Sequence, residues 1–246
     1  MRKILFSALS LLIALLPFSA SAKKLHTIGD STMANYNEES TIKGWGQMLQ
    51  QFLDGIEVNN RAKSGSSTKS FYNAPEYWAS SVQKQISAGD IVLIQFAHND
   101  EKNGGMDGEE VIAYYKSKGD EAKANSTSNI GTNPSTTYKA YLRKYVEDTR
   151  KLGAEPILVG PICRKYFTGS TIRRNGRHDL GDSFDKLTAS GPVSGQKVAE
   201  SDHSMDYVYQ MKEVAKEMNV PFVDLTTATK ELYESYGDSK CTELLF

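Results

Sequence analysis

Residues 90–96 place the strongest constraint on the fold of this chain. They read Asp-Ile-Val-Leu-Ile-Gln-Phe, an apolar and β-branched run in which polar residues do not alternate. A strand of this composition is covered on both faces, as in a parallel sheet with helices above and below it. The sequence therefore predicts an α/β protein built on a parallel sheet.

Further strands and helices are predicted on both sides of this segment. The other strands are expected at residues 25–28, 56–60, 156–161 and 220–225. Apolar residues at helical spacing come after them, in the segments 44–53, 78–86, 138–152, 205–218 and 226–236. Five strand–helix alternations predict a three-layer α/β/α sandwich with a five-stranded parallel sheet, a flavodoxin-like arrangement.

Two polar stretches interrupt the alternation. The first runs from the end of the 90–96 strand to about residue 137, and the second begins after residue 161 and includes the basic run 173–178. Both are predicted to be loop excursions from the core. The basic run could meet an acidic polymer, although a solvated loop is the commoner explanation of such a run.

The first residues have the pattern of a targeting segment. Arg2 and Lys3 precede the apolar stretch 4–18, and Ala20-Ser21-Ala22 gives the small-residue cleavage pattern. The apolar stretch is short for a membrane span. We therefore expect a signal peptide at residues 1–22, export to the periplasm or the exterior, no membrane anchor after cleavage, and one domain at residues 23–246.

Charge and composition exclude several classes of protein. Lys and Arg number 29 and Asp and Glu 30, so the formal net charge of -1 argues against a non-specific nucleic-acid binder. The histidines lie without metal-ligand spacing, and no cofactor or metal is predicted. Two cysteines, Cys163 and Cys241, could pair in an exported protein or remain as buried free thiols. We expect a monomer.

The segment Gly29-Asp30-Ser31 comes directly after the first predicted strand. Chemistry collects at the carboxyl edge of open α/β sheets, where a serine can be a nucleophile if a base takes its proton and donors await the oxyanion. Gly-Asp-Ser-Thr is also typical of a turn with a helix N-cap. The loops at the ends of the later strands decide between the two interpretations.

The loops after the second and third strands supply matching groups. Right-handed crossovers bring Ser31, Gly65 and Asn99 to the same edge of the sheet. Ser31 offers a hydroxyl and its own N–H, Gly65 an N–H with no side chain in the way, and Asn99 a carboxamide N–H. Together they predict a nucleophile with an oxyanion hole, the requirement of acyl transfer.

On these residues the chain resembles the SGNH (GDSL-type) hydrolase family. The family's blocks are a Gly-Asp-Ser, a glycine loop, a Gly-x-Asn-Asp and a late Asp-x-x-His. Three are present, as Gly29-Asp30-Ser31, Ser64-Gly65 and Ala97-His98-Asn99-Asp100. Ala97 replaces the family glycine, which leaves the role of Asn99 intact. The resemblance implies the SGNH hydrolase fold, with Ser31 as nucleophile and Ser31, Gly65 and Asn99 as the oxyanion hole.

Within that family the chain is similar to the rhamnogalacturonan acetylesterases. The similarity is carried by residues 29–33, 44–47, 60–71, 96–100 and 220–226, and it extends from Leu25 to the last residue. It implies removal of acetyl groups from a pectic polysaccharide, with water as the final acceptor. The predicted substrate-contacting residues beside the catalytic ones are His98, Asp30, Thr32 and Ser66.

The family's general base is absent from this sequence. No Asp-x-x-His occurs, and Glu200-x-x-His203 precedes the fifth predicted strand, which is the wrong place for the base. His98 can contact substrate or pack in its loop, His26 is expected to be structural, and His178 is expected to be exposed.

Two explanations of the missing base remain open. Either the sequence is a fragment truncated at its C-terminal end, or the protein ends at Phe246 and Ser31 has no general base. The apolar ending with no closing helix favours the fragment. In both cases we expect the chain as written to be weak or inactive.

Other functions remain open at this stage. The same scaffold could carry a lipase, a thioesterase or another carbohydrate esterase, although no lid-like apolar segment lies next to Ser31. A different class is a non-catalytic polysaccharide-binding protein that keeps the pocket without the base.

Overall fold

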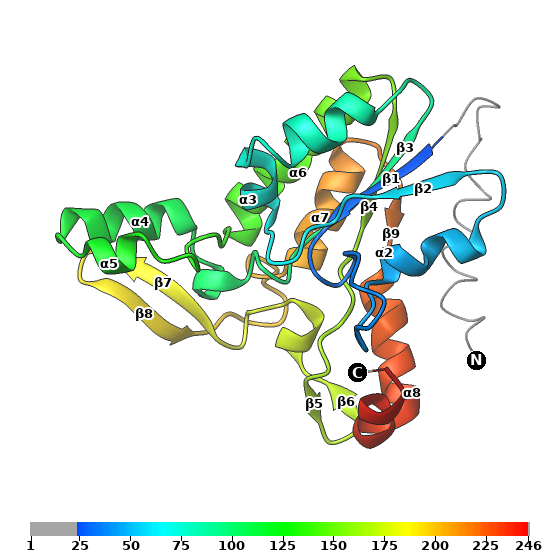
Figure 1. Ribbon diagram of the computed structural model, residues 1–246. Coiled ribbons are helices and arrows are strands. Elements are labelled where there is room, and N and C mark those ends of the chain that lie inside the picture. Colours follow the sequence, from blue (N-terminus) through cyan, green and yellow to red (C-terminus); the bar gives the residue numbers. More distant parts are fainter. Residues whose placement is uncertain (1–23, 246) are drawn as a thin grey trace.

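The computed structural model describes residues 24–245, so the predicted signal peptide lies outside the described residues. Its centre is a five-stranded sheet with the order β2-β1-β3-β4-β9, and all four strand pairs are parallel. The sheet confirms the predicted α/β sandwich (Figure 1). The strands are β1 (Lys24–Gly29), β2 (Glu57–Asn60), β3 (Ile91–Gln95), β4 (Glu155–Val159) and β9 (Phe222–Val223).

The central position of β3 in the sheet explains why its sequence is almost entirely apolar. Every residue of β3 is buried, and successive side chains enter different cores because they point to opposite faces of the sheet. Val92 and Ile94 pack in the larger core, whereas Ile91 and Leu93 pack in the smaller one. A strand with side chains packed in two cores has no solvent-exposed face, which is why polar and apolar residues do not alternate in its sequence.

Helices cover both faces of the sheet (Figure 1). The larger core contains fully buried rings from the elements on its side, among them Trp78, Tyr138, Tyr145 and Tyr207. Those elements are α3 (Thr68–Asn73), η2 (Trp78–Val82), η5 (Pro134–Tyr138), α6 (Lys139–Lys151) and α7 (Tyr207–Glu217). The short η3 (Gln83–Gln85) follows η2 and buries none of its residues. The smaller core is closed by α2 (Trp45–Met48), η1 (Leu49–Phe52) and the start of α8 (Leu225–Leu245).

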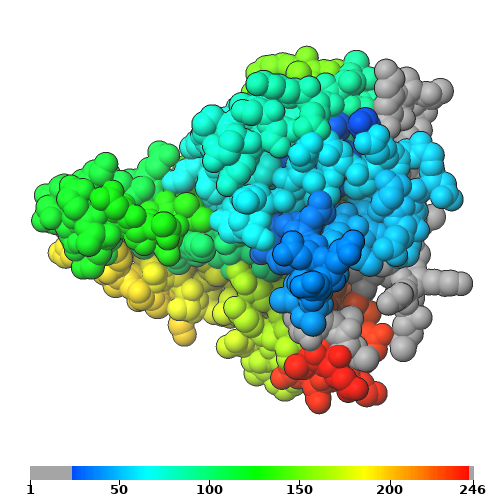
Figure 2. Space-filling model, in the orientation of Figure 1, coloured from blue at the N-terminus to red at the C-terminus, as the bar shows by residue number. Residues whose placement is uncertain are grey.

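The polar stretch after β3 is not a simple loop, so that prediction was wrong. It contains η4 (Lys102–Gly105), α4 (Gly108–Ser117) and α5 (Glu121–Ala124). Helix α4 buries only Gly108 and Val111, which leaves too few apolar residues for a detectable helical pattern. Together with a hairpin of β7 (Phe184–Thr188) and β8 (Gly191–Gln196), these helices form an arm that projects from the body (Figure 2).

The second polar stretch is also structured. Besides β7 and β8, it contains a short hairpin of β5 (Phe167–Thr168) and β6 (Thr171–Ile172), with η6 (Arg174–Arg177) after it. This hairpin contacts α8 and lies beside it in Figure 1. The prediction of a simple loop is therefore wrong here as well.

The last helix is longer than predicted. Helix α8 runs from Leu225 to Leu245, with a break at Gly237, whose φ is 73°. The expected absence of a closing helix is therefore wrong.

Cys163 and Cys241 are both buried and free. Of the two alternatives considered for the cysteines, a disulfide or buried free thiols, the structure has the buried free thiols. No helix within residues 24–245 is long and apolar enough to cross a bilayer.

Candidate active site

A tight turn at the end of β1 presents Ser31. The Asp30 carboxylate accepts hydrogen bonds from the N–H of Thr32 at 2.9 Å and from its hydroxyl at 2.7 Å. Gly29 has to be a glycine because a Cβ there would lie 2.6 Å from the main-chain oxygen of Gln95. These constraints place the half-buried Ser31 at the carboxyl edge of the sheet.

The side chains of Trp45 and Gln95 support this turn through hydrogen bonds. The indole N–H of Trp45 donates to the Gln95 side chain at 2.6 Å, and the Gln95 amide donates to the Thr32 hydroxyl at 3.0 Å. The main-chain N–H of Trp45 also donates to the Thr32 oxygen at 2.9 Å. The Gly44-Trp45 segment therefore helps to hold the turn that carries Ser31.

The loop after β2 continues alongside the end of β1. The N–H of Lys63 donates to the oxygen of Gly29 at 2.9 Å, which brings the next residues toward the Ser31 turn. Gly65 has a φ of 80°, is exposed, and has open space around it. Within residues 24–245 its N–H has no hydrogen-bond acceptor, so this donor is available to a ligand.

The loop after β3 is fastened to the loop after β2. The side-chain amide of Asn99 donates to the main-chain oxygen of Ser66 at 3.0 Å, and Asn99 is 9% exposed. Asp100 is fully buried and accepts from the hydroxyl of Thr68 at 2.5 Å and from that of Thr132 at 2.8 Å. The structure thus brings the loops of Ser31, Gly65 and Asn99 together at one edge.

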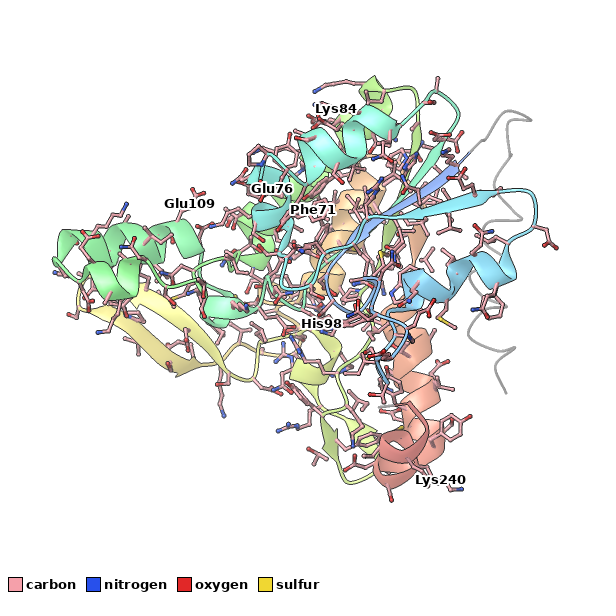
Figure 3. The ribbon with its side chains drawn as sticks, viewed as in Figure 1. Phe71, Glu76, Lys84, His98, Glu109 and Lys240 are labelled. Atoms are coloured by element: carbon pink, nitrogen blue, oxygen red, sulfur yellow. The ribbon has the colours of Figure 1, made fainter. Side chains whose placement is uncertain are left out.

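A buried ionic cluster that sequence reasoning missed lies behind this edge. The Glu101 carboxylate contacts the His178 ring at 2.5 Å and accepts from Arg164 at 3.0 Å. Arg164 also donates to the main-chain oxygen of His98 at 2.8 Å. The two histidine rings lie 4.5 Å apart, and both donate to the oxygen of Ile162. In Figure 3, His98 lies between the carboxyl ends of the strands and the lower part of the chain.

The cluster corrects the prediction for His178. Its side chain is 0% exposed rather than exposed, because both ring nitrogens are used inside the protein. Glu101 comes from the loop after β3, and Arg164 and His178 come from the polar stretch after β4, more than 60 residues further along the chain, so no local spacing could have joined them. The only signal was that Glu101 comes immediately after the Asn99-Asp100 pair.

Burial and charge shift several pKa values at this site. Burial, with the charges of His178 and Arg164, lowers the pKa of His98 well below its usual value, so the ring is neutral near pH 7. Burial alone would raise the pKa of Glu101, but His178 and Arg164 outweigh it and lower that pKa. Burial raises the pKa of Asp30, and it raises that of Asp100 to about 7.

Burial also changes the predicted set of substrate contacts. Asp30 is 0% and Ser66 is 3% exposed, so neither offers a substrate appreciable surface. Asp30 instead fixes the turn, and the Ser66 oxygen anchors Asn99. Thr32 and His98 are half-buried, and substrate contact remains a prediction for these two alone.

None of the four histidines is hydrogen-bonded to Ser31 within the described part of the chain. His26 contacts Asp90 at 3.1 Å and Asn59 at 3.0 Å, which agrees with the structural role expected of it. His203 stacks on Tyr209 with ring centroids 4.1 Å apart. His98 and His178 both point a nitrogen at the oxygen of Ile162.

A separate cavity of about 420 Å³ lies at the base of the arm, between η4 and the β7–β8 hairpin. Its lining includes Asp107, Phe184 and Met205. Ser31, Gly65 and Asn99 are not part of it, so the candidate active site is an open edge rather than this cavity.

The fold and the motif-bearing loops define a carboxylic ester hydrolase of the GDSL type. Residues 27–240 match the GDSL-like Lipase/Acylhydrolase family, and the chain belongs to it. The match covers the Ser31 turn, the glycine loop and the Asn99 loop, as well as the sheet that carries them.

Two curated relatives come from Bacillus subtilis (strain 168). The rhamnogalacturonan acetylesterase RhgT is 31% identical over 220 residues, which cover 88% of this chain and 70% of the relative. The probable rhamnogalacturonan acetylesterase YesY is 28% identical over 220 residues, which cover 89% of this chain and 77% of the relative.

The structural comparison supports the fold. The crystal structure of the protein YXIM from Bacillus subtilis superposes with a TM-score of 0.59 at 22% identity. The match covers 92% of this chain but only 50% of that one, so the present chain spans half the length of that structure.

Proposed function

We propose that this protein removes acetyl groups from a pectic polysaccharide. The proposal is supported by the names of the relatives RhgT and YesY, each matched over most of this chain. It is also supported by the meeting of the three loops at the carboxyl edge of the sheet, where α/β proteins bind their ligands.

In the proposed mechanism Ser31 attacks the acetyl carbonyl. The Ser31 oxygen forms a bond to the carbonyl carbon, and the carbonyl oxygen becomes an oxyanion. The sugar oxygen then leaves with a proton, and water releases acetate from the acetyl-serine by the same route. The donors to the oxyanion in this proposal are the N–H groups of Ser31 and Gly65 and the second amide hydrogen of Asn99, whose first hydrogen is held by Ser66.

The Ser31 proton needs an acceptor, and in residues 24–245 no histidine is hydrogen-bonded to it. We therefore propose that residues 1–246 alone hydrolyse esters weakly. Donors and binding without a base still give some acceleration over water.

The observation that carries the proposal is the 3.0 Å hydrogen bond from Asn99 to the oxygen of Ser66. It orients one donor beside the free N–H of Gly65. The test is acetate release from acetylated rhamnogalacturonan by the wild type, by Ser31→Ala, and by Ser40→Ala as a matched control in the same β1–α2 connection, where the Ser40 hydroxyl donates to the main-chain oxygen of Ile42. We expect Ser31→Ala to fall to background and Ser40→Ala to match the wild type. Equal release by all three proteins would contradict the proposal.

A second candidate, a non-catalytic polysaccharide-binding protein, is favoured by the lack of a histidine on Ser31. Acetate release distinguishes the polysaccharide-binding protein from the esterase. The binder predicts no acetate release by the wild type and unchanged polymer binding in Ser31→Ala. The esterase predicts release that depends on Ser31.

We also propose that the protein is exported after cleavage at Ala22 and acts as a monomer. The proposal rests on the basic, apolar and small-residue pattern of residues 1–22. N-terminal sequencing of the secreted or periplasmic protein tests it, with Lys23 as the expected first residue. Light scattering tests the monomer.

A further inference from the structure

The cavity at the base of the arm has the size of a small-molecule site. Its volume of about 420 Å³ lies within the range of about 300–1,000 Å³ that is usual for such sites. Its walls come from η4, α4 and β7 of the arm, and from η5 and Met205 of the body (Figure 1). Ser31, Gly65 and Asn99 do not line it. We call this space the arm cavity.

One wall of the arm cavity is a buried carboxylate that the protein uses only in part. Asp107 is 5% exposed, and its Oδ1 accepts from the N–H of Glu109 at 2.7 Å as the N-cap of α4. Its Oδ2 is buried and has no hydrogen-bond donor within residues 24–245. The ammonium of the buried Lys69 lies 3.8 Å from Oδ1, beyond hydrogen-bonding distance. A buried acceptor without a donor is costly, and a hydroxyl of a bound ligand would supply the donor.

Two further carboxylates line the arm cavity. Asp185 is half-buried on β7 and Glu110 is exposed on α4, and within the described chain neither forms an ion pair. The nearby ammonium groups are those of Lys186, which also lines the cavity, and of Lys69, which lies next to Asp107. Three carboxylates against two ammonium groups leave an excess of negative charge, which disfavours an anionic ligand.

Apolar side chains form the rest of the wall. Phe184 is half-buried and packs against the larger core, and Leu187 lies on the same strand. Met106 and Met205 are buried and line the cavity from η4 and from the segment before α7. An apolar surface beside a few polar groups is the usual composition of a small-molecule site. A sugar ring suits this wall, because its C–H face is apolar and its hydroxyls can donate to carboxylates.

We propose that the arm cavity binds a neutral sugar residue at a site separate from the candidate active site. The hydroxyls of the sugar donate to the carboxylates, and its C–H face packs on the Phe184 ring. An anionic sugar would bring its own carboxylate against Asp185 and Glu110, whereas an organic cation would meet the ammonium of Lys186. The inference goes beyond the proposed function, because it concerns a second site and holds whether or not Ser31 hydrolyses an ester.

The test follows methionine methyl groups by NMR, because methionines report on both sites. Met106 and Met205 line the arm cavity, whereas Met33 is buried in the turn that carries Ser31, where its N–H donates to the Asp30 oxygen. The full chain, labelled with carbon-13 at these methyl groups, is titrated with the methyl glycosides of galactose, glucose, xylose and rhamnose. Methyl galacturonate, which adds a carboxylate to the galactose ring, and the organic cation putrescine are titrated in parallel.

Two substitutions remove one proposed contact each. Phe184→Ala removes the ring, and Asp185→Asn removes the charge of the acceptor at nearly constant size. Glu121→Gln is the matched control, because Glu121 is an exposed carboxylate on α5 of the same arm and does not line the cavity. An unchanged Met33 signal shows that a variant keeps the wild-type fold around the sheet.

We expect at least one neutral glycoside to shift the signals of Met106 and Met205 and to leave that of Met33 unchanged. Phe184→Ala and Asp185→Asn should each raise its Kd about tenfold, as expected for the loss of a ring contact or of a hydrogen bond to a charged group. Glu121→Gln should not change it. Added salt should leave the Kd unchanged, because the ligand carries no charge to be screened.

Three results would overturn the inference. The first is that no neutral glycoside shifts Met106 or Met205, and the second is that both variants bind as the wild type does. The third is tighter binding of putrescine or of methyl galacturonate than of every neutral glycoside. A glycoside that shifts Met33 alone would support ligand binding at the candidate active site and exclude the arm cavity, so the two sites can be told apart.

Discussion

The side-chain amide of Asn99 lies 3.0 Å from the main-chain oxygen of Ser66 and donates to it. This hydrogen bond joins the loop after β3 to the loop after β2, which in turn is fastened to the end of β1 through Lys63 and Gly29. Three loops that are distant in sequence are thereby held in one arrangement. The position of each donor at the site depends on the other two loops.

Removing the Asn99 amide should reduce ester hydrolysis more than it reduces stability. In the proposed mechanism, Asn99→Ala loses one oxyanion donor, so kcat/KM for an acetyl ester should fall about 100-fold or more. KM should change little, because the donor acts on the charge that develops in the transition state. Steady-state acetate release measures this effect. Asn99→Ala with wild-type kcat/KM would exclude Asn99 from the oxyanion hole.

The buried carboxyl of Asp100 should make stability depend on pH. Burial raises its pKa from 3.8 to about 7 in the folded protein. Between about pH 4 and pH 7 the unfolded chain releases a proton that the folded protein keeps, so rising pH lowers the free energy of unfolding.

Asp100→Asn should flatten this dependence, because the amide does not titrate. Urea unfolding at pH 5 and pH 8 measures the slope, and Asp54→Asn, which is on the surface, is the control. An identical slope in the wild type and Asp100→Asn would show that this carboxyl does not hold a proton in the folded state.

Glu101 should be important for stability because it compensates Arg164 and His178. Glu101→Gln removes the carboxylate that contacts both Arg164 and His178 in a largely buried position, at a cost of about 3 kcal/mol in the free energy of unfolding. The matched control is Glu57→Gln, which breaks an exposed pair with Lys24 and should cost less than about 1 kcal/mol.

The same carboxylate predicts a loss of stability in acid. The folded-state pKa of Glu101 is below its usual 4.5, so its contribution is present above that pH and is lost as the pH falls below it. Chemical denaturation between pH 3 and pH 6 should show a steeper decline in the wild type than in Glu101→Gln. Parallel curves would mean that the carboxylate is not stabilised by its partners.

The two cysteines should be unreactive in the folded protein. Cys163 is 1% and Cys241 is 0% exposed, and burial raises the pKa of Cys163 to about 12. Because the thiolate is the reactive form, a thiol reagent at pH 8 should label neither residue until the protein unfolds. Peptide mapping after labelling, with and without denaturant, measures this. Rapid labelling of the native protein would place a thiol at the surface.

The sheet and the three loops could be predicted because their signals are local. Strand β3 has an apolar run because its residues fill two cores, and Gly65 lies in a polar loop where a φ of 80° requires a flexible residue. Helix α4 was missed because it is mostly exposed, with Val111 as its one large buried side chain. The cluster of Glu101, Arg164 and His178 is assembled by tertiary contacts, which no sequence spacing records.

The central claim is that Ser31 carries the acetyl group during hydrolysis. The most direct measurement is to mix the protein with an activated acetyl ester, quench in acid, and locate the acetyl group by peptide mass spectrometry. We predict an acetyl group on Ser31 in the wild type and none on that peptide in Ser31→Ala. Acetate release without acetylation of Ser31, or an acetyl group on another residue that turns over at the rate of release, would contradict the account.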